Sequence, residues 1–155
     1  VLDLRRMASE DFEAALEAAD FLQGDGELAR LKTASSETVR FAAPGPVSEA
    51  EAPGRMALLM DRTTAGAPEI FAAALQASKR ATVVGLQTPG KIFGYTTVPL
   101  PDGSNLTFAS QSYKTSKGQD LAEFGVKPDV VVEADWDEVS VESDPAIEKA
   151  VELLE

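Results

Sequence analysis

The stretch from Met56 to Val84 constrains the fold most, because its pattern is that of a buried strand, a buried helix and a second buried strand in succession. Met56–Met60 is a continuous apolar run, which is typical of a strand covered on both faces. Pro68 suits the first turn of a helix, where its missing N–H costs nothing. Ala81–Val84 is the second apolar run. The helix between them is expected to bury Ile70, Phe71, Ala74 and Leu75. Strands that alternate with helices indicate an α/β layered domain.

The rest of the chain continues this alternation of strands and helices. Ser9 can cap a helix whose first turn carries Glu10 and Asp11, both favourable at the positive end of the helix dipole. Apolar residues then recur at helical spacing as far as Leu22. The other expected elements are strands at Val1–Leu4 and Asp129–Val132, hairpins that pair Glu27–Lys32 with Glu37–Phe41 and Tyr95–Leu100 with Asn105–Ser112, and a last helix capped by Asp144.

The length of 155 residues predicts a single domain, 1–155. Within it, residues 42–54 are rich in Ala, Pro, Gly and Glu, and we expect them to form a mobile linker. The chain opens directly on the expected strand Val1–Leu4, which indicates a fragment of a longer protein. No apolar run is long enough to span a membrane, so we expect no membrane insertion.

The charge of the chain is strongly negative, with 26 acidic residues against 14 basic ones and a net charge of −12. This balance argues against nucleic acid and anionic membrane surfaces as partners, because both require clustered Lys and Arg. The chain has neither cysteine nor histidine, which excludes a disulfide, a thiolate nucleophile, a zinc finger and a Ser-His-Asp triad. Proton transfer would fall to Lys, Asp, Glu or Tyr, and we expect no metal and no cofactor.

Several short motifs, in the right order along the chain, resemble the core of the C-terminal processing peptidases, also called tail-specific proteases, which use a Ser/Lys dyad. These motifs are Leu2–Arg5, Thr63–Leu75, Leu100–Ser104, Gly125–Asp129 and the closing helix from Asp144 to Leu154. The resemblance implies a ClpP/crotonase-like fold, a polypeptide substrate or ligand, and a periplasmic or secreted location. It also implies that an N-terminal region and a substrate-binding PDZ domain are absent from this chain.

The resemblance places the catalytic dyad of the family at Gly66 and Lys91, because the lysine of the family lies 25 positions after its nucleophilic serine. Gly66 has no side chain with which to attack a carbonyl. Lys91 holds the position of the general base, where a lysine must be buried for its pKa to fall. The apolar residues Ile92 and Phe93 that follow it favour a side chain pointing into the site, and a surface lysine after a turn is the equal alternative. The backbone N–H of Ala67 would contribute to the oxyanion hole. We therefore expect no peptidase activity from this chain.

The turn that stabilises the oxyanion in the family also departs from its pattern. The family has D-L-R-x-N-x-G-G, and oxyanion donors of this kind are typically worth about 10²–10³ in rate. This chain has no glycine pair between Arg5 and Asp11, and Glu10 and Asp11 would bring negative charge near the intended anion. Tyr95 stands where the family has a glutamine. Three parts of the expected site have therefore changed together.

Other polar residues near the dyad have structural interpretations that compete with chemical ones. Thr63 and Thr64 carry hydroxyls, which we expect to hydrogen-bond within a turn rather than to act as nucleophiles. Glu69 is expected to act at the helix start or in packing rather than in acid–base chemistry. Trp136 is expected to pack against the domain edge. Around it lie Glu133, Asp135, Asp137 and Glu138, which lack a calcium-loop pattern and are expected to form a solvated acidic face.

Three functions remain open on the sequence alone. The first is an inactive peptidase homologue that serves as a peptide-binding or scaffolding module. The second is a working serine endopeptidase whose nucleophile was replaced. The third is a crotonase-like enzyme acting on an acyl thioester, which would need an oxyanion hole and a basic pocket that this sequence does not offer. The sequence leaves the oligomeric state open, a homo-oligomer included.

Overall fold

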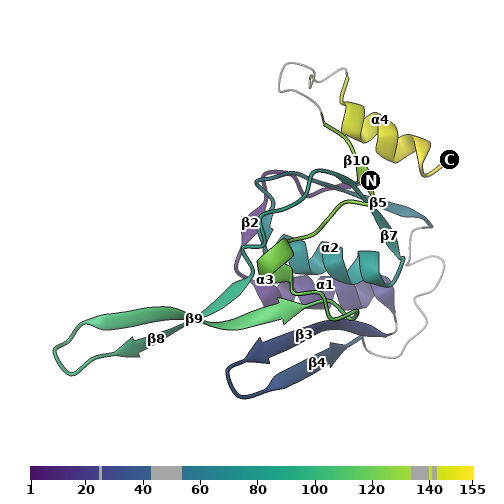
Figure 1. The fold of residues 1–155 in the computed structure, drawn as a ribbon. Helices are drawn as coiled ribbons and strands as arrows, with labels where there is room; N and C mark the ends of the chain where they lie inside the picture. Colours follow the sequence, from purple (N-terminus) through teal and green to yellow (C-terminus); the bar gives the residue numbers. More distant parts are fainter. Residues whose placement is uncertain (25, 43–53, 134–139, 141–142) are drawn as a thin grey trace.

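The computed structural model describes residues 1–24, 26–42, 54–133, 140 and 143–155 (Figure 1). Its central sheet is parallel and has the strand order β1-β5-β7-β10. The strands are β1 (Leu2–Asp3), β5 (Met56–Met60), β7 (Ala81–Gly85) and β10 (Val130–Val131). Leu58, Leu59, Val83 and Val84 are fully buried in the two middle strands. The two apolar runs of the sequence therefore form the centre of this sheet, as predicted.

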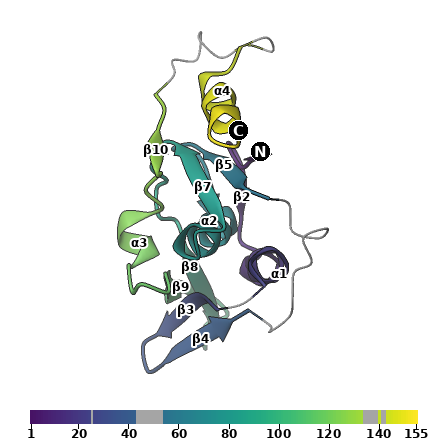
Figure 2. The same ribbon diagram turned by 90° about the vertical axis from the view of Figure 1, so that its right-hand side faces the viewer.

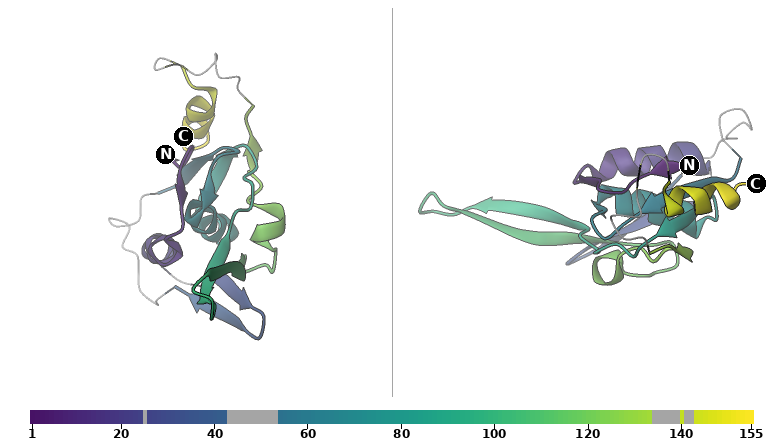
Figure 3. Two further views of the ribbon diagram at one scale, coloured as in Figure 1. Left: turned by 90° about the vertical axis from the view of Figure 1, so that its left-hand side faces the viewer. Right: turned by 90° about the horizontal axis from the view of Figure 1, so that it is seen from above.

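A second, antiparallel sheet has the order β4-β3-β9-β8. Its strands are β3 (Glu27–Thr33), β4 (Glu37–Phe41), β8 (Phe93–Pro99) and β9 (Asn105–Lys114). Both hairpins expected from the sequence are present. Strands β8 and β9 run on past the end of β3 and project from the body of the molecule as a long arm (Figures 1 and 3).

The helices complete a layered α/β arrangement. Helix α2 (Ala67–Ala77) lies between the two sheets with α1 (Phe12–Gln23) beside it, and α4 (Pro145–Glu152) packs on the other face of the central sheet (Figure 2). Every residue of α2 from Ala67 to Leu75 is buried. A helix that is apolar on nearly all sides belongs in such a core. A short helix, α3 (Leu121–Phe124), follows β9.

One predicted helix cap is wrong. Ser9 does not cap α1, because it lies in an unpredicted short strand, β2 (Ala8–Ser9). The N-cap of α1 is Asp11, whose carboxylate accepts a hydrogen bond from the Ala14 N–H at 3.1 Å. The hydroxyl of Ser9 instead accepts the backbone N–H of Asp11 at 3.1 Å. The prediction that Asp144 caps the last helix is confirmed, since its carboxylate accepts the Ala146 N–H at 3.0 Å.

Some expectations fall on residues outside the described part of the chain. These are the linker, apart from its end residues Ala42 and Gly54, and the acidic face around Trp136, apart from the exposed Glu133. The organisation as one domain, 1–155, stays a prediction. In the described residues, none of the helices is both long enough and apolar enough to cross a membrane.

Candidate active site

Gly66 stands at the sharp turn that joins strand β6 (Ala65–Gly66) to helix α2. Its backbone has φ +77° and ψ −126°, a conformation that L residues rarely adopt and glycine adopts readily. A strained strand-to-helix turn of this kind is a common seat for an exposed nucleophile in hydrolases. The shape of the turn is therefore what a nucleophile position requires, although the residue in it has no side chain.

Strand β2 occupies the space that a side chain at position 66 would need. Strands β2 and β6 pair in parallel, with Ser9 opposite Gly66. A Cβ added to Gly66 would lie 2.2 Å from the backbone oxygen of Ser9, far inside any real contact. The Ala65 N–H donates to the Met7 oxygen at 3.0 Å, which holds the start of β2 in place. The segment that replaces the glycine-pair turn of the family thus closes over the turn at Gly66.

Lys91 lies beside Gly66 in space, but its side chain is exposed. The backbone oxygen of Lys91 is 3.7 Å from the position that a Cβ on Gly66 would take, so the dyad spacing does bring the two positions together. The sequence left open whether Lys91 points into the site or lies on the surface; in the structure its side chain is solvent-exposed, whereas that of Ile92 is fully buried. Within the described part of the chain, the Lys91 ammonium has no hydrogen-bond or ion-pair partner.

Glu69 connects the start of α2 to the loop that carries Lys91. Its carboxylate is fully buried and accepts the backbone N–H of Gly66 at 2.8 Å and that of Gly90 at 2.8 Å. It also accepts the hydroxyl of Thr88, whose oxygen in turn accepts the Val126 N–H at 2.8 Å. Three donors satisfy this buried carboxylate. The expected role of Glu69 at the helix start is confirmed, and Thr88 is a supporting residue that the sequence did not single out.

The two threonines before Gly66 are committed to a turn around Asp61. The Thr63 hydroxyl donates to the Asp61 carboxylate at 2.7 Å, and the buried Thr64 hydroxyl lies 3.0 Å from the Leu4 backbone oxygen. Burial raises the pKa of Asp61, but hydrogen bonds from Thr63, Thr64 and the Arg6 N–H outweigh it and hold this pKa below its usual value. The predicted role of both threonines in turn hydrogen bonding is confirmed.

The remaining residues of the expected site lie apart from one another. Asp11 is committed to the cap of α1, and Glu10 is exposed. Tyr95 lies on the projecting arm opposite Ala109 and is 58% exposed. Ala67, the expected oxyanion donor, is buried at the first position of α2. The carbonyl oxygen of Ser9 beside this turn is an acceptor, which is the wrong polarity for stabilising an oxyanion.

An apolar groove of about 430 Å³ opens next to the Gly66 turn. Its walls come from α1, α2 and the first two strands: Leu2, Leu4, Met7, Ala14, Ala15, Ala18, Ala67, Pro68 and Phe71, with Asp3, Ser9 and Asp11 as its polar members. The alanines of α1 keep the groove open because their side chains are short. It is wide enough for one or two apolar side chains of a bound chain.

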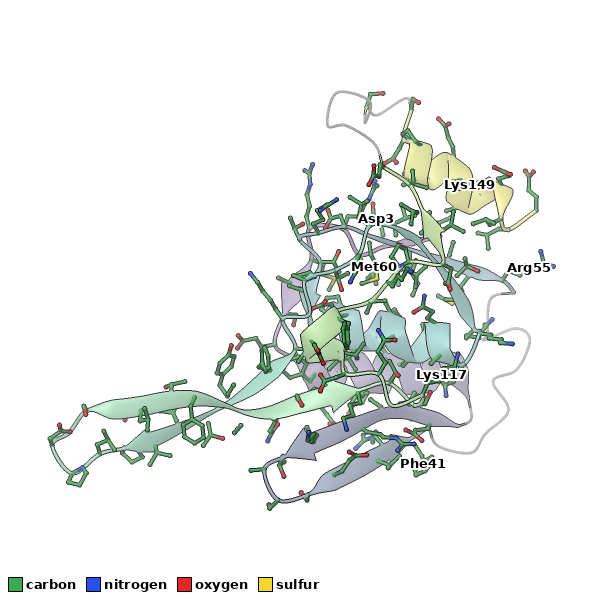
Figure 4. The ribbon with its side chains drawn as sticks, viewed as in Figure 1. Asp3, Phe41, Arg55, Met60, Lys117 and Lys149 are labelled. Carbon is green, nitrogen blue, oxygen red and sulfur yellow. The ribbon has the colours of Figure 1, made fainter. Side chains whose placement is uncertain are left out.

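A second, polar cavity of about 470 Å³ lies at the carboxyl ends of the central strands, between Asp3 and the start of α4 (Figure 4). Arg5 holds it together, since its guanidinium is 2.7 Å from the carboxylates of both Asp3 and Asp144. Burial raises the pKa of Asp144, but the hydrogen bond and charge of Arg5, together with the backbone N–H groups of Ile147 and Ala146, outweigh it and hold this pKa below its usual value. These charges satisfy one another and fix α4 to the sheet. Among the described residues, no cluster of acidic side chains could hold a metal ion.

Comparison with known proteins identifies the family to which the chain is similar. Residues 1–132 match the sequence model of peptidase family S41. The chain is 36% identical over 132 residues to a chloroplastic C-terminal processing peptidase of Tetradesmus obliquus, which covers 84% of this chain and 28% of that protein. It is 29% identical to a carboxyl-terminal-processing protease of Synechocystis, over 99% of this chain and 36% of that protein.

The solved structure of a photosystem II D1 C-terminal processing protease superposes with a TM-score of 0.76 at 30% identity. The superposition covers 90% of this chain and 35% of that protein. This chain thus spans about a third of the length of these relatives, in the part that carries the turn at Gly66 and the loop at Lys91. The fold, the order of the motifs and the match over residues 1–132 lead to one conclusion: the chain belongs to peptidase family S41.

Proposed function

We propose that this chain is an S41 peptidase homologue that binds polypeptide without cleaving it. The observation that carries the proposal is the turn at position 66, where a glycine with φ +77° packs against the Ser9 oxygen. A serine at this position would need both a strained backbone and the space that β2 now fills. The residue that the family uses for attack is therefore absent, together with the room for it.

The surroundings of Gly66 support the same proposal. Serine–lysine chemistry requires the lysine amine to reach the nucleophile inside the site, and the side chain of Lys91 is exposed to solvent. It also requires donors around the developing oxyanion, whereas the Ser9 carbonyl oxygen lies at the turn. Restoring a serine at position 66 alone would therefore leave the exposed lysine and the missing oxyanion donors unchanged.

The proposed ligand is a polypeptide with an apolar side chain at or near its C-terminus. Peptidases act on polypeptides, and the apolar groove is lined by Ala67 and Pro68, which directly follow Gly66, so a peptide in it would lie beside the position of the nucleophile. A site of this size with mostly apolar walls is typical of ligand binding. Catalysis is not needed for such a groove to retain its affinity.

The alternative is a working endopeptidase in which glycine replaced the nucleophile and little else changed. The two proposals differ in what Gly66→Ser does. If only the nucleophile has changed, a serine at position 66 should restore cleavage. If the chain is a binding module, this substitution should give no cleavage. The position of β2 over Gly66 favours the binding module.

The experiment measures binding and cleavage on the same fluorescent peptide, which ends in an apolar residue. We expect saturable binding by fluorescence anisotropy and no hydrolysis by mass spectrometry. Ala18→Trp fills the groove and should weaken binding about tenfold or more, since Ala18 lines it. Ser35→Trp adds the same ring at the exposed turn between β3 and β4 and should bind as the parent does. Hydrolysis by the parent chain, or equal binding by both variants, would reject the proposal.

A further inference from the structure

The arm formed by β8 and β9 presents an apolar face that the described body of the molecule does not cover (Figure 3). The cross-strand register pairs Thr96 with Phe108 and Val98 with Leu106, which places Val98, Leu106 and Phe108 on one face. These three side chains are 40%, 50% and 44% exposed. An isolated two-stranded hairpin is marginally stable in water, so the arm is expected to gain further strands or another surface as a partner.

The arm also has a free backbone edge beside this face. Strand β3 pairs with β9 only from Gln111 to Lys114, so in the described part of the chain residues 105–110 of β9 have no strand on that side. A groove of about 390 Å³ opens where β3 ends, and Phe93 and Phe108 contribute to its walls. Strands at an exposed edge usually carry Lys or Pro against unwanted pairing. The segment Asn105–Ser110 has neither, and no charge at all.

The charge distribution indicates which partner fits this edge. The chain has a net charge of −12, yet Asp102 is the sole charged residue from Phe93 to Tyr113. Two copies of the chain repel each other over most of their surfaces, and this repulsion is weakest where two arms meet. A free antiparallel edge with an apolar face is also complementary to itself, as a two-fold interface requires.

We propose that the arm is a homodimerisation element, in which residues 105–109 of β9 pair antiparallel with the same residues of a second copy. A two-fold axis perpendicular to the sheet keeps each side chain on the same face in both copies. Because side chains alternate between the faces along a strand, two opposed residues must both have odd numbers or both have even numbers. An axis at Thr107 sets Leu106 opposite Phe108 of the second copy, a favourable aliphatic–aromatic pair. An axis at Phe108 would set Leu106 opposite Ser110 instead. The arrangement with Thr107 on the axis therefore brings the apolar side chains of the two copies into lateral contact on one face of the joined sheet.

This interface does not depend on the proposed binding of polypeptide. The arm lies outside the Gly66 turn, and its residues do not line the groove beside that turn. Dimerisation and peptide binding can therefore succeed or fail separately.

The first test compares two charge substitutions by analytical ultracentrifugation of the 155-residue chain over a dilution series. Thr97 and Thr107 face each other, with their hydroxyl oxygens 2.8 Å apart. Thr107→Lys and Thr97→Lys break the same hydrogen bond and add the same charge. Only Thr107→Lys puts two like charges against each other on the axis, and it should raise the dimer dissociation constant about tenfold. Thr97→Lys places them roughly 14 Å apart, beyond the Debye length, and should change it less than about twofold.

The second test uses cysteine, which the chain lacks. Residues directly opposed across an antiparallel pair have Cα atoms about 4.5–5.5 Å apart, within the range of a disulfide. Thr107→Cys should therefore form a covalent dimer in a glutathione redox buffer, and Thr97→Cys should not. The proposal is overturned if the parent chain is monomeric at about 1 mM, if the two lysine variants dissociate alike, or if Thr107→Cys gives no covalent dimer.

Discussion

Gly66→Ser tests whether the turn before α2 has lost the room for a nucleophile. The backbone conformation at Gly66, with φ +77° and ψ −126°, costs an L residue about 1–3 kcal/mol. The new Cβ would also stand 2.2 Å from the Ser9 oxygen, so β2 must move away from β6. Each backbone hydrogen bond lost in that movement costs about 0.5–1.5 kcal/mol. We expect the free energy of unfolding to fall by about 3–5 kcal/mol in total.

The matched control is Gly118→Ser, because Gly118 has φ +83° but nothing within 4 Å of an added Cβ. It carries only the conformational cost, about 1–3 kcal/mol. Urea unfolding followed by circular dichroism gives both values, and an unchanged m-value ensures that midpoints can be compared. If Gly66→Ser destabilises the chain no more than Gly118→Ser does, then β2 does not constrain position 66. Strong peptide hydrolysis by Gly66→Ser would also refute the reasoning, since it would show that the turn accepts a working nucleophile.

Three further outcomes follow from the buried polar contacts. Glu69→Gln turns an NH₂ group toward the N–H donors of Gly66 and Gly90 and should lower the free energy of unfolding in urea by about 1–3 kcal/mol. Its control, Glu123→Gln on the exposed face of α3, should change this free energy by less than about 0.5 kcal/mol. Arg5→Met leaves the carboxylate of Asp144, which is only 8% exposed, without its cation and should cost roughly 2 kcal/mol, with α4 exchanging its amide hydrogens faster. The folded-state pKa of Asp61 lies below its unfolded value, so Asp61 contributes to the free energy of unfolding above about pH 4, and this contribution is lost as the pH falls through the folded-state pKa. Asp61→Asn should therefore flatten this part of a stability–pH curve. An unchanged curve would contradict the lowered pKa of Asp61.

The sequence was sufficient for the core because apolar runs and helical spacing report burial directly. Met56–Met60 and Ala81–Val84 form the middle of the parallel sheet, and the helix that begins near Pro68 is buried between two sheets. The 25-residue spacing also correctly predicted that positions 66 and 91 lie close together, since the backbone oxygen of Lys91 is beside Gly66. The strands and the helix were predictable because each depends on which side chains are buried in the core and which are exposed, and the spacing of apolar residues encodes that difference.

The direction of the Lys91 side chain was not predictable from the character of its neighbours. The apolar Ile92 and Phe93 were compatible with an inward and with an outward side chain of Lys91. The Ile92 N–H donates to the Gly90 oxygen at 2.9 Å, so Lys91 is the central residue of a tight turn, where its side chain is exposed while that of Ile92 is fully buried. The hydroxyl of Thr88 was missed for a different reason. It meets Glu69 across 19 residues, and no local pattern encodes a contact of that kind.

The pairing of β2 with β6 also has no signature in the sequence, because it involves two residues on each strand and is made by backbone atoms. This matters for how the site could be changed. The atom that fills the space at position 66 is the carbonyl oxygen of Ser9, which remains in any Ser9 variant. Glycines placed in this segment would add freedom but would not remove the obstacle while β2 stays paired with β6. Glycine at position 66 and strand β2 therefore depend on each other: the glycine lets the strand approach, and the strand leaves room for nothing else. A nucleophile returns only if the segment from Arg5 to Asp11 takes a different path, which requires replacing the segment as a whole.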